Sequence, residues 1–185
     1  IRVEIFDPRK GASQEYINEI RDFIVQPKSP WMSKGEQIYV EKSLNGQLSD
    51  LCVDRFVVGR LKNAIVGNVW YQVPVDRKDV GVLGFVFTDP VHRGRGISTF
   101  LTRVAIDRFR EEGGICLQLA TGNPIAHHIY KKWGFRDYNG HVMRWLSDGK
   151  DFAGFDRKLF ANTGKAKVRI AAWGDAVKAA CLYSA

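Results

Sequence analysis

The chain has 185 residues, of which 45% are hydrophobic and 26% are charged. This length suits one domain, or one domain with an appendage, and the composition excludes a disordered or collagen-like chain. The longest apolar run, near residues 81–87, is too short to cross a bilayer, so we expect no transmembrane segment. The 28 basic residues exceed the 20 acidic ones, mostly after residue 80, which suits an anionic partner such as nucleic acid, a membrane surface or a phosphorylated cofactor.

The cysteines and histidines do not form a metal-binding pattern. Cys52, Cys116 and Cys181 are odd in number, widely separated and without CxxC spacing, which argues against a disulfide framework or a zinc cluster. We interpret them as reduced core residues and expect a cytoplasmic protein. His127 and His128 are adjacent, with no carboxylate or cysteine at ligand spacing, so no metal site is predicted.

The apolar periodicity along the chain predicts an alternation of strands and helices. In chain order, the expected elements are a strand at 3–6, a helix at 13–24, a long loop with room for one helical piece at 26–50, an antiparallel meander at 52–60, 64–73 and 80–87, a helix at 97–109, a strand at 115–120, a helix at 123–133 and a strand pair at 135–145. The first domain is predicted to span 1–146. The extension, 147–185, reads as a linker followed by the strand and helix that begin a second, similar domain.

A basic, glycine-containing loop joins the strand at 80–87 to the helix at 97–109. It reads Arg93-Gly94-Arg95-Gly96-Ile97-Ser98, and Thr99 follows in the first helical turn. Glycines let the backbone approach a ligand, and a helix N-terminus attracts anions. The loop matches neither GxxxxGK[ST] nor GxGxxG, so it predicts a phosphate site of another kind. The alternative is an ordinary turn with solvated arginines.

This loop resembles the acyl-CoA pyrophosphate loop of the GNAT N-acetyltransferase superfamily, whose motif is [Q/R]-x-x-G-x-[G/A]. Arg93, Gly96 and Ser98 occupy the marked positions, and Thr88-Asp89-Pro90 stands where the family has V-x-P. Ser98 and Thr88 depart from the motif, but both are small. A second segment, from Asn123 through Tyr130 to Gly134-Phe135, is similar to the family pattern N-x-x-A-x-x-x-Y-x-x-x-G-F.

The resemblance implies an α/β GNAT fold: a mixed, mostly antiparallel sheet with helices on both faces and a V-shaped opening between two central strands. It implies transfer of an acyl group, most simply acetyl from acetyl-CoA, to a primary amine by direct attack. Asn123 would hold the cofactor arm, and Tyr130 would protonate the leaving thiolate as general acid. The remaining cofactor-binding residues would be the strand backbone and the loop: Val86, Phe87, Thr88, Arg93, Gly94, Arg95, Gly96, Ile97, Ser98 and Thr99.

Other interpretations of these residues stay open. Tyr130 could be a packed aromatic, and Asn123 could serve only as a helix N-cap before Pro124. No general base is evident. The nearby candidates for it are Asp79, Asp89 and His92, and the candidates for an acceptor pocket are Trp31, Met32, Trp70 and Tyr71.

The expected partner is a small-molecule or peptide amine, with no membrane, and with a second GNAT-like domain or a second copy of the chain as further partners. Two rival functions remain. The first is a CoA-binding or structural module without transfer activity. The second, ranked last because no nucleic-acid motif is present, is a nucleic-acid binder.

Overall fold

The computed structural model describes residues 1–25, 32–149 and 151–161. Its centre is a seven-stranded sheet in the order β1-β2-β3-β4-β5-β7-β6, in which every neighbouring pair is antiparallel except β4 with β5. The strands are β1 (Arg2–Phe6), β2 (Cys52–Leu61), β3 (Ala64–Pro74), β4 (Val80–Thr88), β5 (Cys116–Ala120), β6 (Arg136–Asn139) and β7 (Val142–Leu146). The predicted mixed, mostly antiparallel architecture is confirmed.

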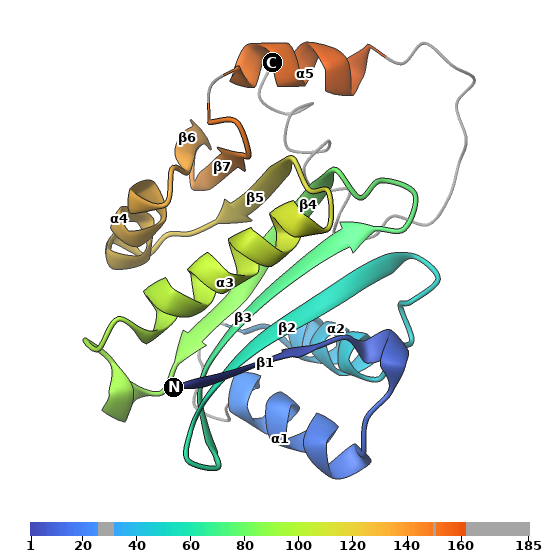
Figure 1. The fold of residues 1–185 in the computed structure, drawn as a ribbon, viewed down its shortest axis with the longest axis vertical. Coiled ribbons are helices and arrows are strands. Elements are labelled where there is room, and N and C mark those ends of the chain that lie inside the picture. The colour runs from blue at the N-terminus through green and yellow to red at the C-terminus, as the bar shows by residue number, and fades with distance from the viewer. Residues whose placement is uncertain (26–31, 150, 162–185) are drawn as a thin grey trace.

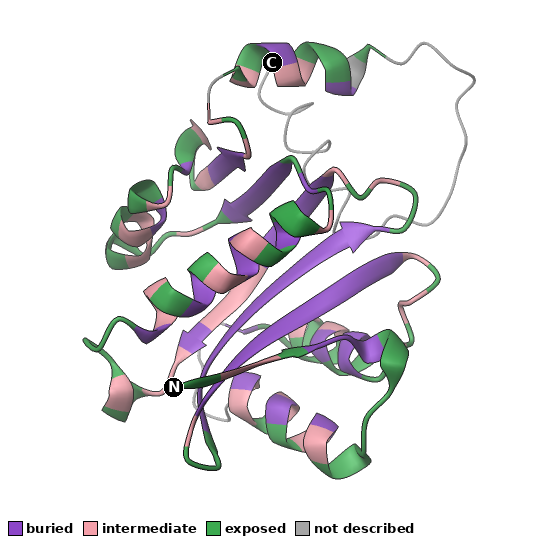
Figure 2. Cartoon of the chain, in the orientation of Figure 1, coloured by how far each residue is buried: buried purple, intermediate pink, exposed green. Residues whose placement is uncertain are grey.

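Helices cover both faces of the sheet. They are η1 (Pro8–Lys10), α1 (Gln14–Ile24), α2 (Lys34–Leu44), η2 (Pro90–His92), α3 (Ile97–Glu111), α4 (Pro124–Lys132) and α5 (Phe152–Phe160). Apolar side chains of α3 and α4 pack on one face, and those of α1, α2 and α5 pack on the other. Figure 1 shows α3 in front of the sheet and α2 behind it, and Figure 2 shows burial concentrated along β2 and β3 between these layers. None of the described helices is long and apolar enough to cross a membrane.

Helix α2 lies where the sequence analysis expects mainly a loop. Its N-terminus is closed by a capping box, in which the Ser33 hydroxyl accepts from the Glu36 N–H at 3.2 Å and the Glu36 carboxylate accepts from the Ser33 N–H at 2.7 Å. The helix buries Val40 and Leu44 but leaves Ile38 exposed. Because its apolar residues do not share one face, the helical periodicity in the sequence is weak. Trp31 lies outside the described residues.

Strands β4 and β5 are paired at one end only. Their parallel register joins Val80 to Cys116 and ends where Val82 pairs with Gln118. Beyond that point β4 runs on to Thr88 beside β3, while β5 turns away from it (Figure 1). Among the described residues, no strand pairs with the β5 side of β4 from residue 83 onward, and the two strands diverge into the V-shaped opening that the resemblance implies.

Helix α5 lies within the segment that the sequence analysis treats as a linker. It is tied to the sheet by Arg144 of β7, which is fully buried, donates to the Gln118 amide oxygen at 3.1 Å and pairs with the Asp156 carboxylate of α5 at 2.6 Å. Phe152 and Phe155 of α5 pack against the same core cluster. The boundary at residue 146 stays a prediction, and the expected strand at 167–173 and helix at 175–183 lie outside the described residues.

Candidate active site

A β-bulge deforms β4 at the opening. Phe85 and Val86 together face the single β3 residue Val69, and Phe85 adopts φ +44°, which is rare for a residue other than glycine. Asn68 of β3 is fully buried and donates from its side-chain amide to the Phe85 carbonyl at 3.0 Å. Because a bulge bends its strand, the backbone from Val86 onward changes direction at the mouth of the opening.

The glycine loop that follows β4 needs its glycines for backbone conformation. Gly94 has φ +74° and Gly96 has φ +73°, whereas a Cβ at either position would meet nothing within 4 Å. The loop is attached to β4 through Arg93, whose Nε donates to the Thr88 carbonyl at 3.2 Å and whose guanidinium lies 5.7 Å from the centre of the Phe87 ring. These contacts bring the loop beside the free end of β4.

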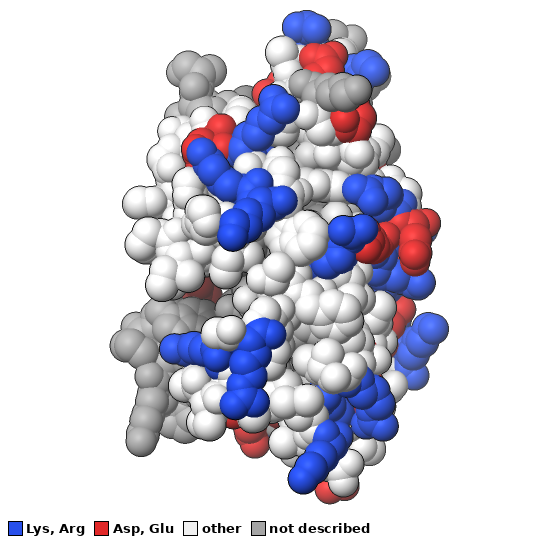
Figure 3. Space-filling view, turned by 60° about the vertical axis from the view of Figure 1, so that its left-hand side comes forward, with Lys and Arg blue, Asp and Glu red and all other residues white. Residues whose placement is uncertain are grey.

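The N-terminus of α3 is open to an anion. Gly96 is the N-cap residue, no side chain caps the helix, and its first turn contains no acidic residue. The Ile97 side chain is buried among residues of the sheet, so only its backbone can reach a ligand. Arg93 and Arg95 are exposed. Figure 3 turns this side of the molecule forward, and lysine and arginine side chains are spread widely over it.

Asn123 serves as the N-cap of α4, as the alternative interpretation requires. Its side-chain oxygen accepts from the backbone N–H groups of Ile125 at 2.9 Å and Ala126 at 3.3 Å, and Pro124 occupies the first helical position. The side chain is also exposed at the end of β5, on the far side of the opening from the glycine loop. Capping therefore leaves the amide nitrogen available for a second role.

Tyr130 belongs to the same buried core cluster as Ile97, and Val86 packs against that cluster. Its side chain is buried, and its ring lies 5.6 Å from that of Phe135. Burial raises the pKa of the Tyr130 phenol to about 12. The hydroxyl has no hydrogen-bond partner among the described residues. Because its pKa is raised to about 12, the Tyr130 hydroxyl is protonated at neutral pH and can donate a proton.

Comparison with known proteins identifies the family. Residues 17–135 match the acetyltransferase (GNAT) family. The chain belongs to this family. The suspected family membership is thus confirmed by a match that spans both motifs.

Relatives of known structure share the GNAT fold. An acetyltransferase from Staphylococcus aureus is 16% identical, with 78% of this chain and 99% of that chain covered and a TM-score of 0.58. An aminoglycoside 6'-N-acetyltransferase complexed with coenzyme A is 13% identical (79% and 97% covered, TM-score 0.58). A GNAT acetyltransferase of Brucella melitensis in complex with acetyl-CoA is 18% identical (79% and 88% covered, TM-score 0.57). At these identities the likeness shows the fold alone.

A sequence relative covers less of the chain. An uncharacterized N-acetyltransferase of Methanocaldococcus jannaschii is 34% identical over 74 residues, which are 39% of this chain and 32% of that protein. The match thus spans about a third of that relative.

The sequence analysis missed a buried polar cluster on the GNAT sheet, on the face opposite α3. Its centre is Asp54 of β2, whose carboxylate accepts from the Trp70 indole N–H at 2.7 Å and from the Gln72 amide at 2.9 Å. The same amide contacts the hydroxyl of Tyr39 on α2. Burial is the largest influence on the pKa of Asp54 and raises it, although the hydrogen bonds from Gln72 and Trp70 act in the opposite direction.

This cluster is connected to the bulge. Trp70, held by Asp54, packs on the ring of Phe85 with a centroid distance of 4.9 Å. Asp54 and Gln72 pair across β2 and β3, and Gln72 pairs with Val82, at the level where β4 and β5 begin to separate. The signal that could have found the cluster is the presence of polar residues inside strands that are otherwise apolar.

Two of the three general-base candidates, Asp89 and Asp79, already have structural contacts, and Asp79 precedes β4, at the end of that strand away from the glycine loop. Asp89 accepts from the Val91 N–H at 2.9 Å and caps η2, and Asp79 forms an ion pair with Arg77 at 2.5 Å. The Nδ1 atom of His92 is buried and has no hydrogen-bond partner among the described residues. None of these contacts points to a base in the opening.

The proposed acceptor-pocket aromatics do not share one pocket. Trp70 lies on the sheet face covered by α1 and α2, where Met32 belongs to the same cluster. Tyr71 lies on the α3 face and donates to Glu112 at 2.8 Å. Successive strand residues point to opposite faces of the sheet, so Tyr71 cannot line a common pocket with Trp70 and Met32.

Proposed function

We propose that this GNAT protein transfers an acetyl group from acetyl-CoA to a primary amine. The observation that carries the proposal is the bulged half of β4, with which no described strand pairs on the β5 side, beside an uncapped helix N-terminus. The fit to coenzyme A rests on the glycine loop and the start of α3. Gly94 and Gly96 are left-handed with open space around them, and the first turn of α3 contains no acidic residue. Similar folds crystallised with coenzyme A and with acetyl-CoA support this choice.

In this proposal the chain holds acetyl-CoA at three places. The backbone N–H groups of the glycine loop and the first turn of α3, together with Arg93 and Arg95, bind the pyrophosphate. The backbone of β4 at residues 86–88, on the side where β5 does not pair with it, binds the pantetheine arm in the manner of an added strand. Asn123 contacts the arm from the opposite side of the opening.

The chain then stabilises the developing charges. The amine nitrogen attacks the thioester carbon, a C–N bond forms, and the C–S bond breaks to give an amide and the CoA thiolate. Backbone N–H groups near Val86 face the oxyanion, and such preorganised donors are usually the largest catalytic contribution. Tyr130 donates its phenolic proton to the thiolate, the proton lost by the amine passes to water, and Tyr130 regains a proton from water before the next turnover.

Calorimetric titration with acetyl-CoA and with CoA tests this proposal. We expect binding to the unchanged chain and its loss in Gly96→Glu, which places a carboxylate at the pyrophosphate site. A matched control is Gly140→Glu, because Gly140 also has positive φ, at +53°, and nothing within 4 Å of its Cβ position. Both variants carry a similar backbone cost of about 1–2 kcal/mol. Binding that survives Gly96→Glu contradicts the assigned site.

A second readout tests transfer itself. Free-thiol release from acetyl-CoA in the presence of amines identifies turnover, and a panel of small-molecule and peptide amines defines the acceptor. Release that does not depend on an added amine contradicts the proposal.

A CoA-binding module without transfer activity is the alternative. It is favoured by the sequence of β4, which contains no Asp, Glu or His between Val80 and Thr88. Tight CoA binding without thiol release on any amine would establish it.

The cytoplasmic location that we propose is supported by Cys52 and Cys116, which are buried free thiols.

A further inference from the structure

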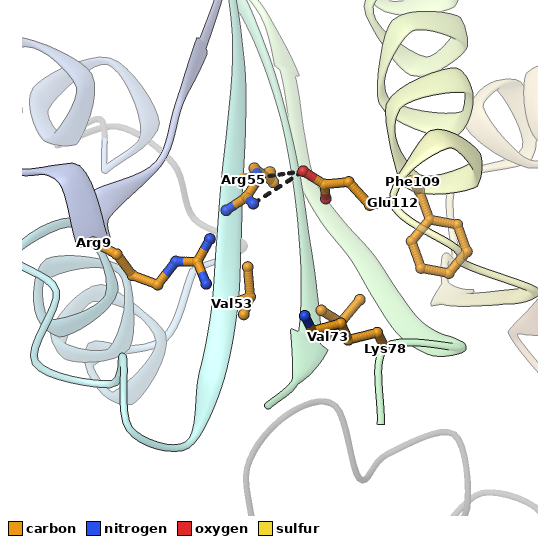
Figure 4. Close-up of a pocket in the computed structure, with 7 residues that line it drawn as sticks. All are labelled: Arg9, Val53, Arg55, Val73, Lys78, Phe109 and Glu112. Atoms are coloured by element: carbon orange, nitrogen blue, oxygen red, sulfur yellow. Dashed lines mark hydrogen bonds and ion pairs between the residues drawn. The ribbon is translucent and has the colours of Figure 1, made fainter. Parts of the chain in front are cut away.

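A cavity lies at the opposite end of α3 from the glycine loop. Its volume is about 270 Å³, and it opens between η1, the start of β2, the end of β3 and the last turn of α3 (Figure 4). It is lined by Arg9, Val53, Arg55, Val73, Lys78, Phe109 and Glu112. Since α3 has 15 residues, the two ends of the helix are roughly 22 Å apart. The cavity is therefore separate from the proposed acetyl-CoA site.

Arg55 forms the rigid wall of the cavity. It is 7% exposed, and its guanidinium pairs with Glu112 at 2.9 Å and Asp7 at 3.0 Å and donates to the Asp54 carbonyl at 2.9 Å. Glu112 in turn accepts from the Tyr71 hydroxyl at 2.8 Å. Arg55 and Glu112 are thus fixed by several contacts each and need not rearrange around a ligand.

Two further cations face the same hollow. Arg9 pairs with Asp7 at 2.8 Å, and Lys78 is exposed and has no ion-pair partner among the described residues. Figure 4 shows the nitrogen ends of Arg9, Arg55 and Lys78 directed toward the hollow from different elements. Arg108 also pairs with Glu112, at 2.9 Å, but it pairs with Glu111 as well, at 3.7 Å, and does not line the cavity.

The charges around the cavity do not balance. Three cationic side chains line the cavity, those of Arg9, Arg55 and Lys78, and they face two carboxylates, those of Asp7 and Glu112, which leaves one more positive than negative charge at its wall. Part of the wall is apolar, because Val53, Val73 and Phe109 are buried and line the cavity. A concave site with apolar walls and a few convergent charged groups is typical of small-molecule binding.

We propose that this cavity binds a small organic anion that has an anionic head and an apolar group. The head lies between Lys78 and Arg9, where charge-assisted hydrogen bonds compensate the excess positive charge. The apolar group lies against Phe109 and the two valines. The ligand binds independently of acetyl-CoA, and nothing in the acetyl-transfer proposal requires it.

Titration calorimetry of the full chain with phenyl phosphate tests the proposal. CoA is kept at saturation so that the glycine loop cannot take up the phosphate probe. We expect phenyl phosphate to bind more tightly than inorganic phosphate, which lacks the apolar group. Phenol, which lacks the charge, should not bind. Phthalate, a dicarboxylate of similar size, shows whether the site selects a phosphate or accepts any dianion.

Variants locate the binding. Lys78→Gln removes a side chain with no ion pair and leaves the fold intact, and it should weaken phenyl phosphate binding about tenfold, as should Arg9→Gln. The matched control is Lys10→Gln, since Lys10 is adjacent to Arg9 but does not line the cavity, and its affinity should equal that of the unchanged chain. Equal affinity in Lys78→Gln and Lys10→Gln, or no binding to the folded chain, overturns the proposal.

The failure of this proposal is distinct from that of the acetyl-transfer proposal. If CoA does not bind, the phenyl phosphate titration is repeated without it, with Arg95→Gln to remove loop binding. Phenyl phosphate binding that depends on Lys78 and not on Arg95 keeps the cavity as a site even then. Binding that depends on Arg95 alone assigns the probe to the loop and overturns the cavity.

Discussion

The side-chain amide of Asn68 donates a hydrogen bond to the Phe85 carbonyl at 3.0 Å and so holds the β4 bulge from the neighbouring strand. Phe85 has φ +44°, a conformation that costs an L-residue free energy unless its surroundings stabilise it. Asn68 is therefore the group that fixes the backbone proposed to bind the thioester. The Asn68 side chain is fully buried, and the hydrogen bond itself is partly buried.

Replacement of Asn68 should reduce turnover more than cofactor binding. Asn68→Leu keeps the branched shape and the number of heavy atoms of the side chain but leaves the Phe85 carbonyl without this donor, which costs about 1–3 kcal/mol. We expect a decrease in kcat of about tenfold because misaligned oxyanion donors lose transition-state stabilisation. The CoA affinity, set mainly by the glycine loop, should change less. Asn18→Leu, on α1, is the control. Unchanged kcat in Asn68→Leu would contradict the positioning role.

Tyr130→Phe tests the general acid. The phenol has no hydrogen-bond partner among the described residues, so its removal should leave thermal stability and the Kd for CoA almost unchanged. A lost general acid lowers kcat by about a hundredfold or more. Tyr16→Phe, which removes a hydroxyl bonded to Glu4, serves as control. Equal turnover in Tyr130→Phe and the unchanged chain removes Tyr130 from the mechanism.

The pH profile provides a separate test of Tyr130. Burial raises the pKa of its phenol to about 12, so the protonated, donating form persists up to that pH. Turnover should therefore rise as the acceptor amine loses its proton and should show no decline below about pH 10 that depends on Tyr130. A decline in turnover with rising pH that begins below pH 10 in the unchanged chain and is missing in Tyr130→Phe would contradict this assignment.

The sequence predicted the parts of the site that are contiguous in the chain. Arg93 to Thr99 could be read directly, because the glycines and the helix start are adjacent in sequence. Asn68 and Phe85 could not be paired, since their contact depends on the β3–β4 register and on a bulge that no local pattern marks. Asp54 was missed for the same reason: its partners Trp70 and Gln72 come from the next strand.

The sequence also failed where helices bury few apolar residues. Helix α5 was read as a linker because its glycine and charges obscure an apolar face, and its attachment depends on a buried arginine in a different element. Such tertiary contacts have no signature in the local periodicity.

The contact between Arg144 and Asp156 should make α5 part of the cooperative fold. Asp156→Ala removes a carboxylate from a fully buried guanidinium, and we expect the free energy of unfolding to fall by about 2–3 kcal/mol. Asp107→Ala breaks a surface ion pair with Arg103, also at 2.6 Å, and should cost less than about 1 kcal/mol. Chemical denaturation of both variants makes the comparison. Equal effects would show that α5 docks only weakly.

Asp54 should make stability depend on pH in a direction opposite to that of a salt-bridged carboxylate. Burial raises its pKa above the ordinary 3.8, so the folded chain holds this proton more tightly than the unfolded chain. The stabilising contribution is complete below about pH 4, the unfolded value, and is lost as the pH rises through the folded pKa. Asp54→Asn keeps an oxygen that can accept from Trp70 and Gln72 and carries no charge.

The stability of Asp54→Asn relative to the unchanged chain should therefore increase from pH 4 to pH 7. Urea denaturation at several pH values measures this difference, and Asp50→Asn, at an exposed position, should show none. A relative stability that falls with pH would mean that the hydrogen bonds outweigh burial.

Turnover separates two roles for Asp54. If it only positions Trp70 against Phe85, the asparagine keeps kcat within a few-fold, whereas loss of a general base lowers kcat by about a hundredfold or more.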